Sequence, residues 1–599
     1  MRKRVEVPKE EKWQLEDMYA NVDDLMKDYQ FLMEHKEDLS NYKGKVLDSA
    51  TNLLETLKID QHLSRMLDKV VIYANLQFDV DSTKEEFLQI KNKMIALQTK
   101  LMEETAYLRP ELLKGNWDII QQYMEELPEL KPFERQLSLV YRMKDHTLSE
   151  AEETVIATLS SVLNTGKESA AMLRNNDMTF GTIQDETGKE VELTNISYAK
   201  LMRSKNRDIR RTTFEQYHNR YHEMRNTLAQ LYHSEVEKHV KLAKLYHFKN
   251  AREMALFRNE IEESLYDQLL EGIQESFPIL YDYYRLKKEV LGLDELHLYD
   301  LYTDLIETDT EVTYTFQEAK ELIIDALGIL GQDYQNLVKK AFEEGWIDQY
   351  PNEGKRPGAY SWGCYDSKPY ILANFNGTYH DVSTLAHEIG HSIHSYLSIQ
   401  NNTYQDYSYK IFVAEVASTT NELLFNQYMF HRSTSRNEKL MILNQQMELF
   451  KATIYRQAMF AEAEKQFHEI VENGETLTAE KLEESYYKLN KRYFGGDVVV
   501  DDAIKSEWSR IPHFYMNFYV YQYATGLSSA SKIVQSILEK KEDAIPNYLK
   551  FLGLGGSMPA IEELKIAGVD ITKKETILDA LSYFQTLIQQ FRLLYQERN

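Results

Sequence analysis

A short histidine–glutamate motif is the part of this chain whose residue types and spacing are best suited to chemistry. Residues 387–391 read His-Glu-Ile-Gly-His. Two residues four positions apart lie on one face of an α-helix, so the imidazoles of His387 and His391 can bind one metal ion. Glu388 then lies beside the first ligand, where its carboxylate can take a proton from a water at the metal. The pattern is typical of a hydrolytic zinc site.

The flanking residues predict that this motif lies on a helix. Between residues 381 and 397, apolar residues recur at helical spacing: Val382, Leu385, Ala386, Ile389, Ile393 and Leu397. Asp381 or Ser383 is the expected N-cap. Inside a helix a glycine such as Gly390 is less favourable than alanine by about 1 kcal/mol. Close approach of another element or of substrate at this position would account for its presence. The alternative is a surface helix that carries two histidines by chance.

A third protein ligand would complete a catalytic zinc site. His394 lies about 10 Å along the helix from His387, too far for one tetrahedral ion, so we expect it to pack or to support a ligand. Glu415 is the better candidate, because it lies among apolar residues in a second helical segment, 411–424, where a buried carboxylate must be paired or metal-bound. An ordinary salt bridge is the alternative. Glu422, on the same face, is expected at most to support a ligand.

A short apolar stretch upstream of the motif is expected to be a β-strand. Tyr370-Ile-Leu-Ala-Asn-Phe is followed by Asn-Gly, which is a turn signal. Such a strand could pair with an extended peptide through its backbone, with Ala373 and Asn374 as the substrate contacts. An interior strand with no free edge is the alternative, and the sequence favours neither.

Taken together, these segments resemble the thimet-oligopeptidase (M3) family of zinc metallopeptidases, and within it the oligoendopeptidase F branch. The likeness includes the His387–His391 motif with Glu415, the stretch 370–377 and the stretch 511–526. It is close from about residue 200 to the C-terminus and looser before it. The resemblance implies a mainly α fold, with two helical lobes around a deep substrate channel and small β elements near the zinc helix and in the N-terminal part.

The resemblance also implies an activity. It makes the protein a zinc endopeptidase that binds one zinc ion per chain through His387, His391 and Glu415, and that cleaves internal bonds of short oligopeptides with Glu388 as the base. His513, Tyr519 and Tyr523 match family residues that donate hydrogen bonds to the oxyanion. The alternatives are a zinc carboxy- or aminopeptidase and an inactive helical peptide-binding scaffold. A structural zinc site is disfavoured, because such sites use four ligands that usually include several cysteines and the chain has one cysteine.

Tyr515 is a further candidate substrate contact in the same segment. Tyr515, Tyr519 and Tyr523 are four residues apart, and a helix would align them on one side. A stripe of aromatic residues packed in the core is the alternative, and the chain has 41 tyrosines. Gly526 stands where mammalian members of the family carry another active-site tyrosine. The resemblance therefore leaves open, within one helical turn, which tyrosine contacts the oxyanion.

Composition and charge narrow the class of protein further. The chain has 599 residues but only 23 glycines and 11 prolines, and no biased linker divides it. We expect an N-terminal helical region (1–200) with a β-hairpin near residues 178–193, followed by a catalytic domain (201–599). Lys and Arg number 70 and Asp and Glu 95, a net charge of −25 that disfavours nucleic acid and anionic membrane as partners. The single cysteine and the absence of a long apolar run favour the cytoplasm. The oligomeric state is left open.

Overall fold

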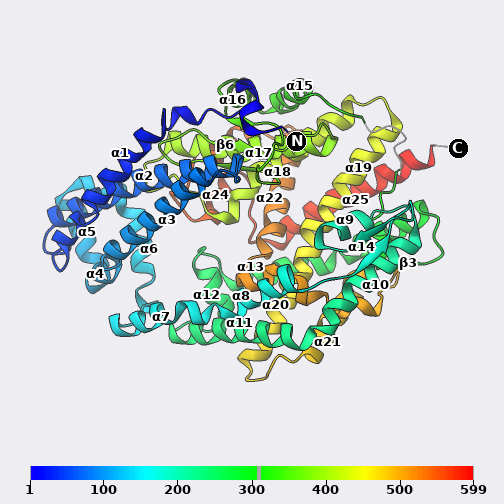
Figure 1. The fold of residues 1–599 in the computed structure, drawn as a ribbon, viewed down its shortest axis with the longest axis horizontal. Helices are drawn as coiled ribbons and strands as arrows, with labels where there is room; N and C mark the ends of the chain where they lie inside the picture. The colour runs from blue at the N-terminus through cyan, green and yellow to red at the C-terminus, as the bar shows by residue number, and fades with distance from the viewer. Residues whose placement is uncertain (1, 307–311, 598–599) are drawn as a thin grey trace. The chain divides into compact units, whose positions relative to one another are not determined.

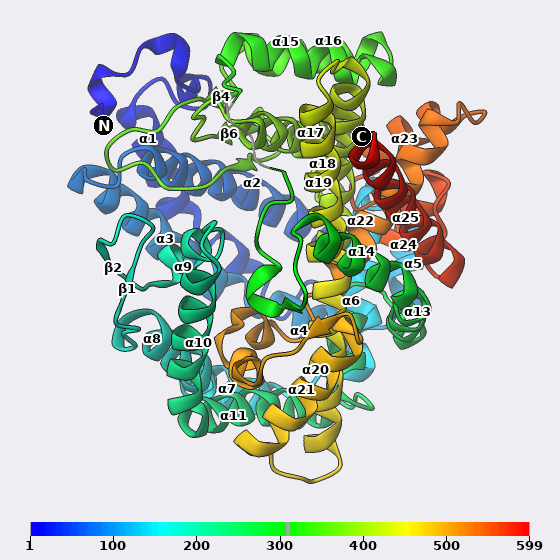
Figure 2. The ribbon, with the colours of Figure 1, turned by 90° about the vertical axis from the view of Figure 1, so that its right-hand side faces the viewer.

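The computed structural model describes residues 2–306 and 312–597. In that part of the chain most residues lie in helices and a few in short strands, as two views show (Figures 1 and 2). The predicted mainly α fold is therefore confirmed, whereas the predicted channel between lobes stays a prediction. Within the same residues, no helix combines the length and the apolar character that crossing a membrane requires.

The chain forms two compact units, each built from three separate stretches. Unit 1 comprises Met1–Thr147, Thr310–Met429 and Ile533–Gly568, and unit 2 comprises Leu148–Asp309, Phe430–Lys532 and Val569–Asn599. Residues far apart in the sequence pack together in both, so the units do not follow the boundary expected near residue 200. Because a compact unit need not be a domain, the division into 1–200 and 201–599 stays a prediction.

Unit 1 contains the metal motif and packs its N-terminal helices around their own cores. One core is formed by residues of the first three helices and the strand Tyr370–Leu372, and another by residues between Val46 and Leu137. The helices wholly within this unit are α1 (Val22–His35), α2 (Ala50–Val80), α3 (Glu85–Thr105), α4 (Leu108–Lys114), α5 (Trp117–Glu126), α6 (Glu134–Arg142), α15 (Phe316–Leu327), α16 (Gln332–Glu343), α17 (Tyr379–Asn401), α23 (Ala544–Leu552) and α24 (Ala560–Ile566).

Unit 2 is also helical and carries the segment with His513. Two helices, α18 (Ile411–Arg432) and α22 (Tyr521–Leu538), begin in one unit and end in the other. The helices wholly within unit 2 are α7 (Glu150–Leu163), α8 (Thr165–Met172), α9 (Asn195–Leu201), α10 (Arg207–Glu223), α11 (Arg225–Leu245), α12 (Ala251–Phe257), α13 (Glu263–Glu275), α14 (Phe277–Val290), α19 (Arg436–Phe450), α20 (Arg456–Glu472), α21 (Ala479–Phe494) and α25 (Lys574–Gln596).

The strands of the described residues form small sheets. β1 (Thr182–Gln184) and β2 (Glu190–Glu192) pair antiparallel, which confirms the hairpin predicted within residues 178–193. β3 (Leu296–His297) pairs parallel with β7 (Val498–Val499). In unit 1, β6 (Tyr370–Leu372) lies between β4 (Ile347–Asp348), which is parallel to it, and β5 (Tyr360–Trp362), which is antiparallel.

The metal helix α17 begins one turn earlier than the sequence suggested. Its N-cap is Thr378, whose hydroxyl accepts a hydrogen bond from the Asp381 amide at 3.1 Å. Asp381 is not the cap but its capping-box partner, because its carboxylate accepts from the Thr378 amide at 3.0 Å. Ser383 lies inside the helix. The predicted apolar face is buried except for the half-buried Leu397, and this burial fixes the direction in which both motif histidines point.

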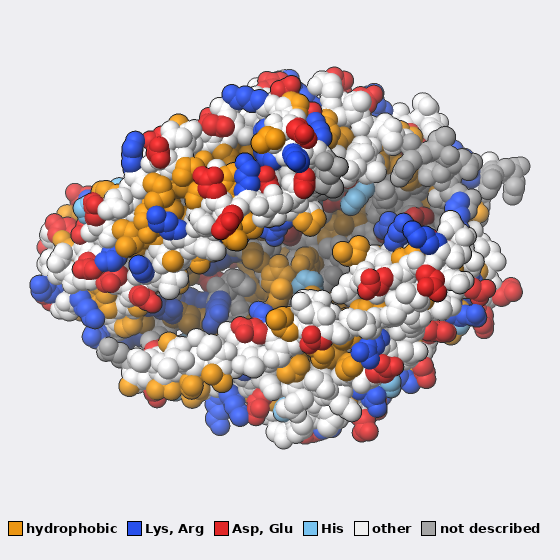
Figure 3. Space-filling view, in the orientation of Figure 1, with side chains coloured by type: hydrophobic (Ala, Val, Ile, Leu, Met, Phe, Trp, Pro, Cys, Tyr) orange, Lys and Arg blue, Asp and Glu red, His pale blue; other side chains and the backbone are white. Residues whose placement is uncertain are grey.

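Helix α18 packs in close contact with α17, and the two helices lie side by side in Figures 1 and 2. A Cβ atom on Gly390 would lie 2.6 Å from the Ser418 Cα and 2.7 Å from the Ala417 oxygen. The residue therefore permits the close approach that its place in the helix predicted. On the viewed surface, acidic and basic side chains are interspersed (Figure 3), so the net negative charge does not form a one-signed face there.

Candidate metal centre

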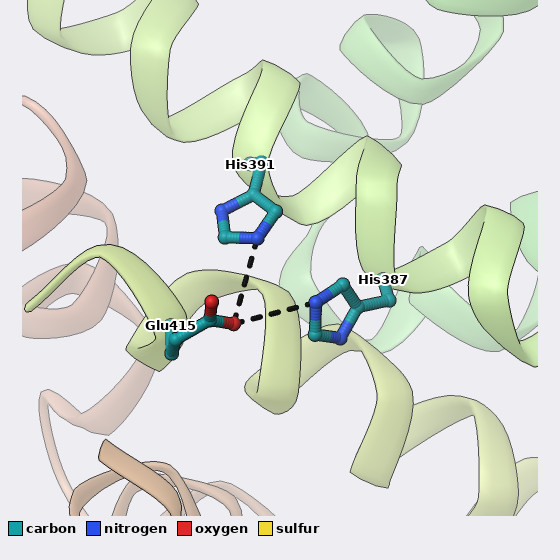
Figure 4. Close-up of side chains that lie close together, drawn as sticks. All are labelled: His387, His391 and Glu415. Atoms are coloured by element: carbon teal, nitrogen blue, oxygen red, sulfur yellow. Dashed lines mark ion pairs between the residues drawn. The ribbon is translucent and has the colours of Figure 1, made fainter. Parts of the chain in front are cut away.

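Three predicted ligands, all of them residues of unit 1, come together from two helices. His387 and His391 project from α17, and Glu415 comes from the first turns of α18 (Figure 4). One carboxylate oxygen of Glu415, Oε2, lies 3.3 Å from His387 Nε2 and 3.5 Å from His391 Nε2. The geometry therefore places both imidazoles on the same oxygen, and one donor atom from each residue lies within 4.8 Å of the others.

These donor atoms suit a tetrahedral divalent ion. Bonds of about 2.0–2.1 Å to a tetrahedral ion place neighbouring ligand atoms roughly 3.3–3.4 Å apart. The two measured N···O separations, 3.3 and 3.5 Å, match that spacing. Two imidazoles and one carboxylate also form a three-ligand set that leaves a coordination position open, as catalytic zinc sites do. The described residues thus fit a zinc ion in both donor type and spacing.

Other side chains hold the ligands in this orientation. Glu422 lies two helical turns beyond Glu415 on α18, with its Oε2 3.1 Å from His387 Nδ1. A carboxylate on the far nitrogen fixes the imidazole so that Nε2 faces the metal, which is a common support in zinc sites. The Ser418 hydroxyl lies 3.0 Å from the same Glu415 oxygen that contacts the histidines. The supporting position expected for Glu422 is the one found.

The carboxylates around His387 make it strongly basic when no metal is present. Burial lowers the pKa of His387, but hydrogen bonds to Glu415 and Glu422 outweigh burial and raise it to about 10. For Glu415, burial raises the pKa, and hydrogen bonds from His387 and His391 lower it below its usual range. A proton and a metal ion therefore compete for the same lone pair.

Glu388 lies beside the ligands and remains available for proton transfer. Its side chain is 7% exposed, and its Oε2 is buried without a hydrogen-bond partner in the described part of the chain. Burial raises the pKa of this carboxyl, while the neighbouring His387 and His391 lower it. A buried carboxylate oxygen with no protein partner, next to a metal-type ligand cluster, is the arrangement that a general base for water requires.

His394 lies on the metal helix itself, with its side chain buried, and is not one of the clustered donors. Its ring stacks on Tyr409 with a centroid separation of 3.8 Å and an angle of 4°. Tyr409 in turn lies 2.8 Å from the Ser395 hydroxyl. Burial lowers the pKa of His394 to about 3, so the ring is neutral. The packing role expected for His394 agrees with this placement.

The sequence analysis did not identify the residues that join the metal helix α17 to α18 and to the sheet. Asn421 of α18 donates to the Ala386 carbonyl of α17 at 3.3 Å and accepts from Tyr334 at 2.7 Å. Ser392, next to His391, lies 2.7 Å from Ser361 of β5 and joins the helix to the sheet. An asparagine on the buried face of a helix was an available signal, since it requires partners. No local signal identified the serine pair.

His513, Tyr519 and Tyr523 form an aromatic cluster within unit 2. The His513 and Tyr519 rings are stacked at 6.2 Å, and Tyr523 stands edge-on to both, 5.9 Å from His513 and 5.5 Å from Tyr519. All three side chains are partly exposed, whereas most of their sequence neighbours are buried. The three residues that the family resemblance implied as oxyanion donors thus lie together, and their role as donors stays a prediction.

The helix predicted to align Tyr515 with the other two tyrosines is wrong. A 3₁₀ helix, η12 (Pro512–Met516), is capped by Asn517, and α22 begins only at Tyr521. Asn517 and Phe518 between them have positive φ angles of 46° and 57°, which end any helix. Tyr515 therefore turns inward, 5% exposed, against Tyr232 and Arg174. This placement is the aromatic core packing weighed as its alternative, not a substrate contact.

The predicted substrate contact at the Ala373 backbone is also corrected. β6 is paired on both sides, so the interior-strand alternative is the one found. The Ala373 amide donates to the Asp348 carbonyl at 2.9 Å, and its carbonyl accepts from Lys355 at 2.6 Å. The Asn374 side chain donates to the carbonyls of Arg356 and Gly358. Both backbone groups of Ala373 are thus bonded within the protein and are not offered to a peptide, whereas a substrate contact at the half-buried Asn374 stays a prediction.

Comparisons with known proteins give a consistent relationship over nearly the whole chain. The model of peptidase family M3 matches residues 200–583, and the model of Oligopeptidase F matches residues 111–180. Oligopeptidase PepF of Bacillus subtilis (strain 168) is 40% identical over 591 residues, which cover 99% of this chain and 88% of that protein.

Two solved structures share the fold at substantial identity. A crystal structure of a Chlamydophila abortus protein has a TM-score of 0.92 and 34% identity, covering 99% of this chain and 100% of that one. The crystal structure of oligoendopeptidase-F from Enterococcus faecium has a TM-score of 0.76 and 31% identity, covering 96% and 99%. The region matched by the M3 model includes all three clustered donors and the aromatic cluster.

Proposed function

The chain belongs to peptidase family M3 and is a metalloendopeptidase, and from that premise we propose that it cleaves internal bonds of short oligopeptides with one zinc ion held by His387, His391 and Glu415. The observation that carries the proposal is the convergence of two imidazoles on one carboxylate oxygen at the spacing of tetrahedral ligands. Four-coordinate zinc with three protein ligands is the usual catalytic form of that ion.

Each residue of the centre then has a defined task. A zinc ion bound there supplies Lewis acidity toward water and the scissile carbonyl. Glu388 accepts the proton of the attacking water at its carboxylate and passes it to the leaving amine. Glu422 keeps His387 oriented through Nδ1, and Ser418 orients the Glu415 carboxylate. The three ligand side chains act by holding position and charge, and only Glu388 moves a proton.

The aromatic cluster supplies hydrogen-bond donors in this proposal. The hydroxyls of Tyr519 and Tyr523 and the imidazole of His513 donate to the oxygen that gains negative charge during attack. One such donor contributes about 3–4 kcal/mol to transition-state stabilisation. Their partial exposure supports the assignment, because a donor of this kind must be reachable by substrate.

An extended peptide that pairs with the sheet adds to β5 and not to β6. β4 and β5 are the two edge strands of the three-stranded sheet, and β6 lies between them. Ser361 of β5 contacts Ser392 of the metal helix, so this edge is joined directly to the element that carries both histidines. Backbone pairing along an edge strand recognises a peptide with little dependence on its side chains.

Replacement of the base tests the mechanism. Glu388→Gln keeps the size of the side chain but cannot accept the proton, so kcat should fall by at least about 100-fold while zinc stays bound. His387→Gln should lose the metal, whereas His380→Gln, an exposed position on the same helix, should retain metal and activity. Metal content by mass spectrometry and cleavage of a fluorogenic peptide are the measurements. A fully active Glu388→Gln variant would remove the general base from the proposal.

Cleavage products separate the proposal from its alternatives. A peptide blocked by acetylation and amidation should be cut at internal bonds, as seen by mass spectrometry of the fragments. Cleavage that requires a free end would identify an exopeptidase, and binding by zinc-loaded protein with no cleavage would identify a peptide-binding scaffold. Equal digestion of a short peptide and of a native globular protein would contradict the restriction to short substrates.

A further inference from the structure

The turn that carries the aromatic cluster has an unusual backbone. Asn517 and Phe518 are consecutive non-glycine residues with positive φ, and they lie between His513 on one side and Tyr519 on the other. L-residues rarely adopt this conformation, and such strain persists only where surrounding structure enforces it. The interactions that enforce the turn are therefore also the ones that set the position of the cluster.

A buried carboxyl group binds this turn. Glu464 of α20 is fully buried, and its Oε1 accepts a hydrogen bond from the Phe518 amide at 2.6 Å. Burial raises the pKa of Glu464 to about 8, so the group is mostly protonated at neutral pH. Its partner is a backbone amide, not a cation, so the contact fixes a backbone position rather than balancing a charge.

The same helix also holds the Phe518 side chain. The Phe518 ring is 3% exposed and lies 4.5 Å from the ring of His468, one turn beyond Glu464 on α20, and 5.8 Å from that of Tyr266. His468 is itself fixed, since its Nδ1 lies 2.9 Å from the Glu464 carbonyl and its Nε2 lies 3.4 Å from His239. One face of α20 thus binds both the amide and the ring of the strained residue.

We infer that Glu464 is a positioning residue that fixes the 517–518 turn and thereby orients His513, Tyr519 and Tyr523 for reaction. The inference rests on the proposed function of those three residues. Glu464 touches no reacting atom and acts only through the Phe518 amide. Loss of its acceptor leaves the strained turn without the hydrogen bond that holds it, and the cluster then samples other orientations.

Matched substitutions at two glutamates of α20 test this role. Glu464→Met removes the acceptor at similar length, and Glu464→Gln restores an acceptor oxygen of the same shape. Glu462→Met is the control, because Glu462 is a buried carboxylate of the same helix that contacts Arg492 and Tyr493 and not the turn. For each variant we would measure zinc content, kcat and KM on a fluorogenic peptide, and hydrogen exchange of the 511–526 segment.

The expected pattern separates positioning from general destabilisation. In Glu464→Met, kcat should fall about 10-fold or more with little change in KM, since small misplacement of catalytic donors costs this much. Zinc content should not change. Glu464→Gln should recover to within about twofold of the wild type, and Glu462→Met should keep its kcat. Equal kcat in Glu464→Met and the wild type, or equal losses in Glu464→Met and Glu462→Met, would overturn the inference.

Hydrogen exchange provides a readout that does not depend on catalysis. In the wild-type protein the Phe518 amide should be strongly protected, and Glu464→Met should exchange faster there but not along α17. A Phe518 amide that exchanges in the wild type as fast as an exposed loop amide would overturn the inference even if Glu464→Met could not be prepared in folded form. Wild-type protein that shows this protection but hydrolyses no peptide would contradict the proposed function and leave the turn contact intact.

Discussion

Replacement of Gly390 by alanine is the most direct test of how the metal centre is built. The residue lies between the two motif histidines on α17, and it faces the α18 backbone at Ala417 and Ser418. In an isolated helix this change should stabilise, because alanine is favoured over glycine by about 1 kcal/mol. Here the added methyl group meets backbone atoms, which cannot move aside by rotating a side chain.

The size of the clash decides whether Gly390→Ala stabilises or destabilises the protein. The new Cβ would lie 2.6 Å from the Ser418 Cα, whereas ordinary contacts are 3.4–4 Å, so the helices must separate by roughly 1 Å. Overpacking of this kind costs typically about 1–3 kcal/mol, which exceeds the gain in helix propensity. The two histidines lie on one of these helices and Glu415 on the other. Metal sites tolerate errors of only about 0.2 Å in ligand distance, so zinc affinity should fall at least about 10-fold.

Zinc affinity by competition with a chromophoric chelator and the Tm of the metal-free protein measure the two effects separately. Gly272→Ala is the matched control, because Gly272 is also inside a helix but its Cβ would meet side-chain atoms of Lys574 and Ile577 at 3.1–3.4 Å, which can adjust. We expect Gly390→Ala to lower both Tm and affinity, and Gly272→Ala to leave affinity unchanged. A Gly390→Ala variant with wild-type affinity would refute the idea that this contact sets the ligand spacing.

Three further results are expected. Glu422→Ala should weaken zinc binding about 10–100-fold without removing a ligand, because His387 loses the carboxylate on Nδ1, and the same chelator competition measures it. Zinc binding at pH 8 should release about one proton, because the pKa of His387 in the metal-free protein is about 10 and a metal-bound imidazole must be neutral. Calorimetry in buffers of different ionisation enthalpy measures this release, and a binding enthalpy that does not depend on the buffer would contradict it. The pKa of Glu464 is raised from an ordinary 4.5 to about 8, so between these pH values the folded state binds more protons than the unfolded state. The free energy of unfolding should therefore fall as pH rises through this range, by up to about 1.4 kcal/mol per pH unit. Glu464→Gln should flatten that pH dependence in denaturant titrations, and an unchanged slope would contradict the burial argument.

The two histidine ligands were predictable because helical periodicity alone places them on one face. The spacing of His387 and His391 determines that they share a face, and the apolar residues of α17 determine which face is buried. Glu415 was harder, since its meeting with the histidines depends on how two helices cross. The buried Gly390 was one sequence signal of that crossing, and the buried Asn421 was another. The N-cap was misplaced by one turn because Thr378, Asp381 and Ser383 are all good capping residues.

The wrong predictions concern segments whose local structure is determined by contacts with distant parts of the chain. Whether a short strand has a free edge depends on partners elsewhere in the chain, and β6 obtains one from residues 347–348 and another from 360–362. The spacing of Tyr515 suggested a helix, but tertiary contacts of Phe518 hold the chain in a conformation that its own preferences oppose. The cytoplasmic location, the substrate channel and the absence of a nucleic-acid partner stay predictions.

One residue links the spacing of the two helices to the orientation of the third ligand. Ser418 supplies the Cα against which Gly390 packs, and its hydroxyl contacts the Glu415 oxygen that both histidines share. A shift of α18 away from α17 therefore moves the carboxylate and its hydrogen-bond support together, so neither can compensate for the other. The absence of a side chain at residue 390 is thus a requirement of the metal geometry rather than of helix stability, which a glycine at this position reduces.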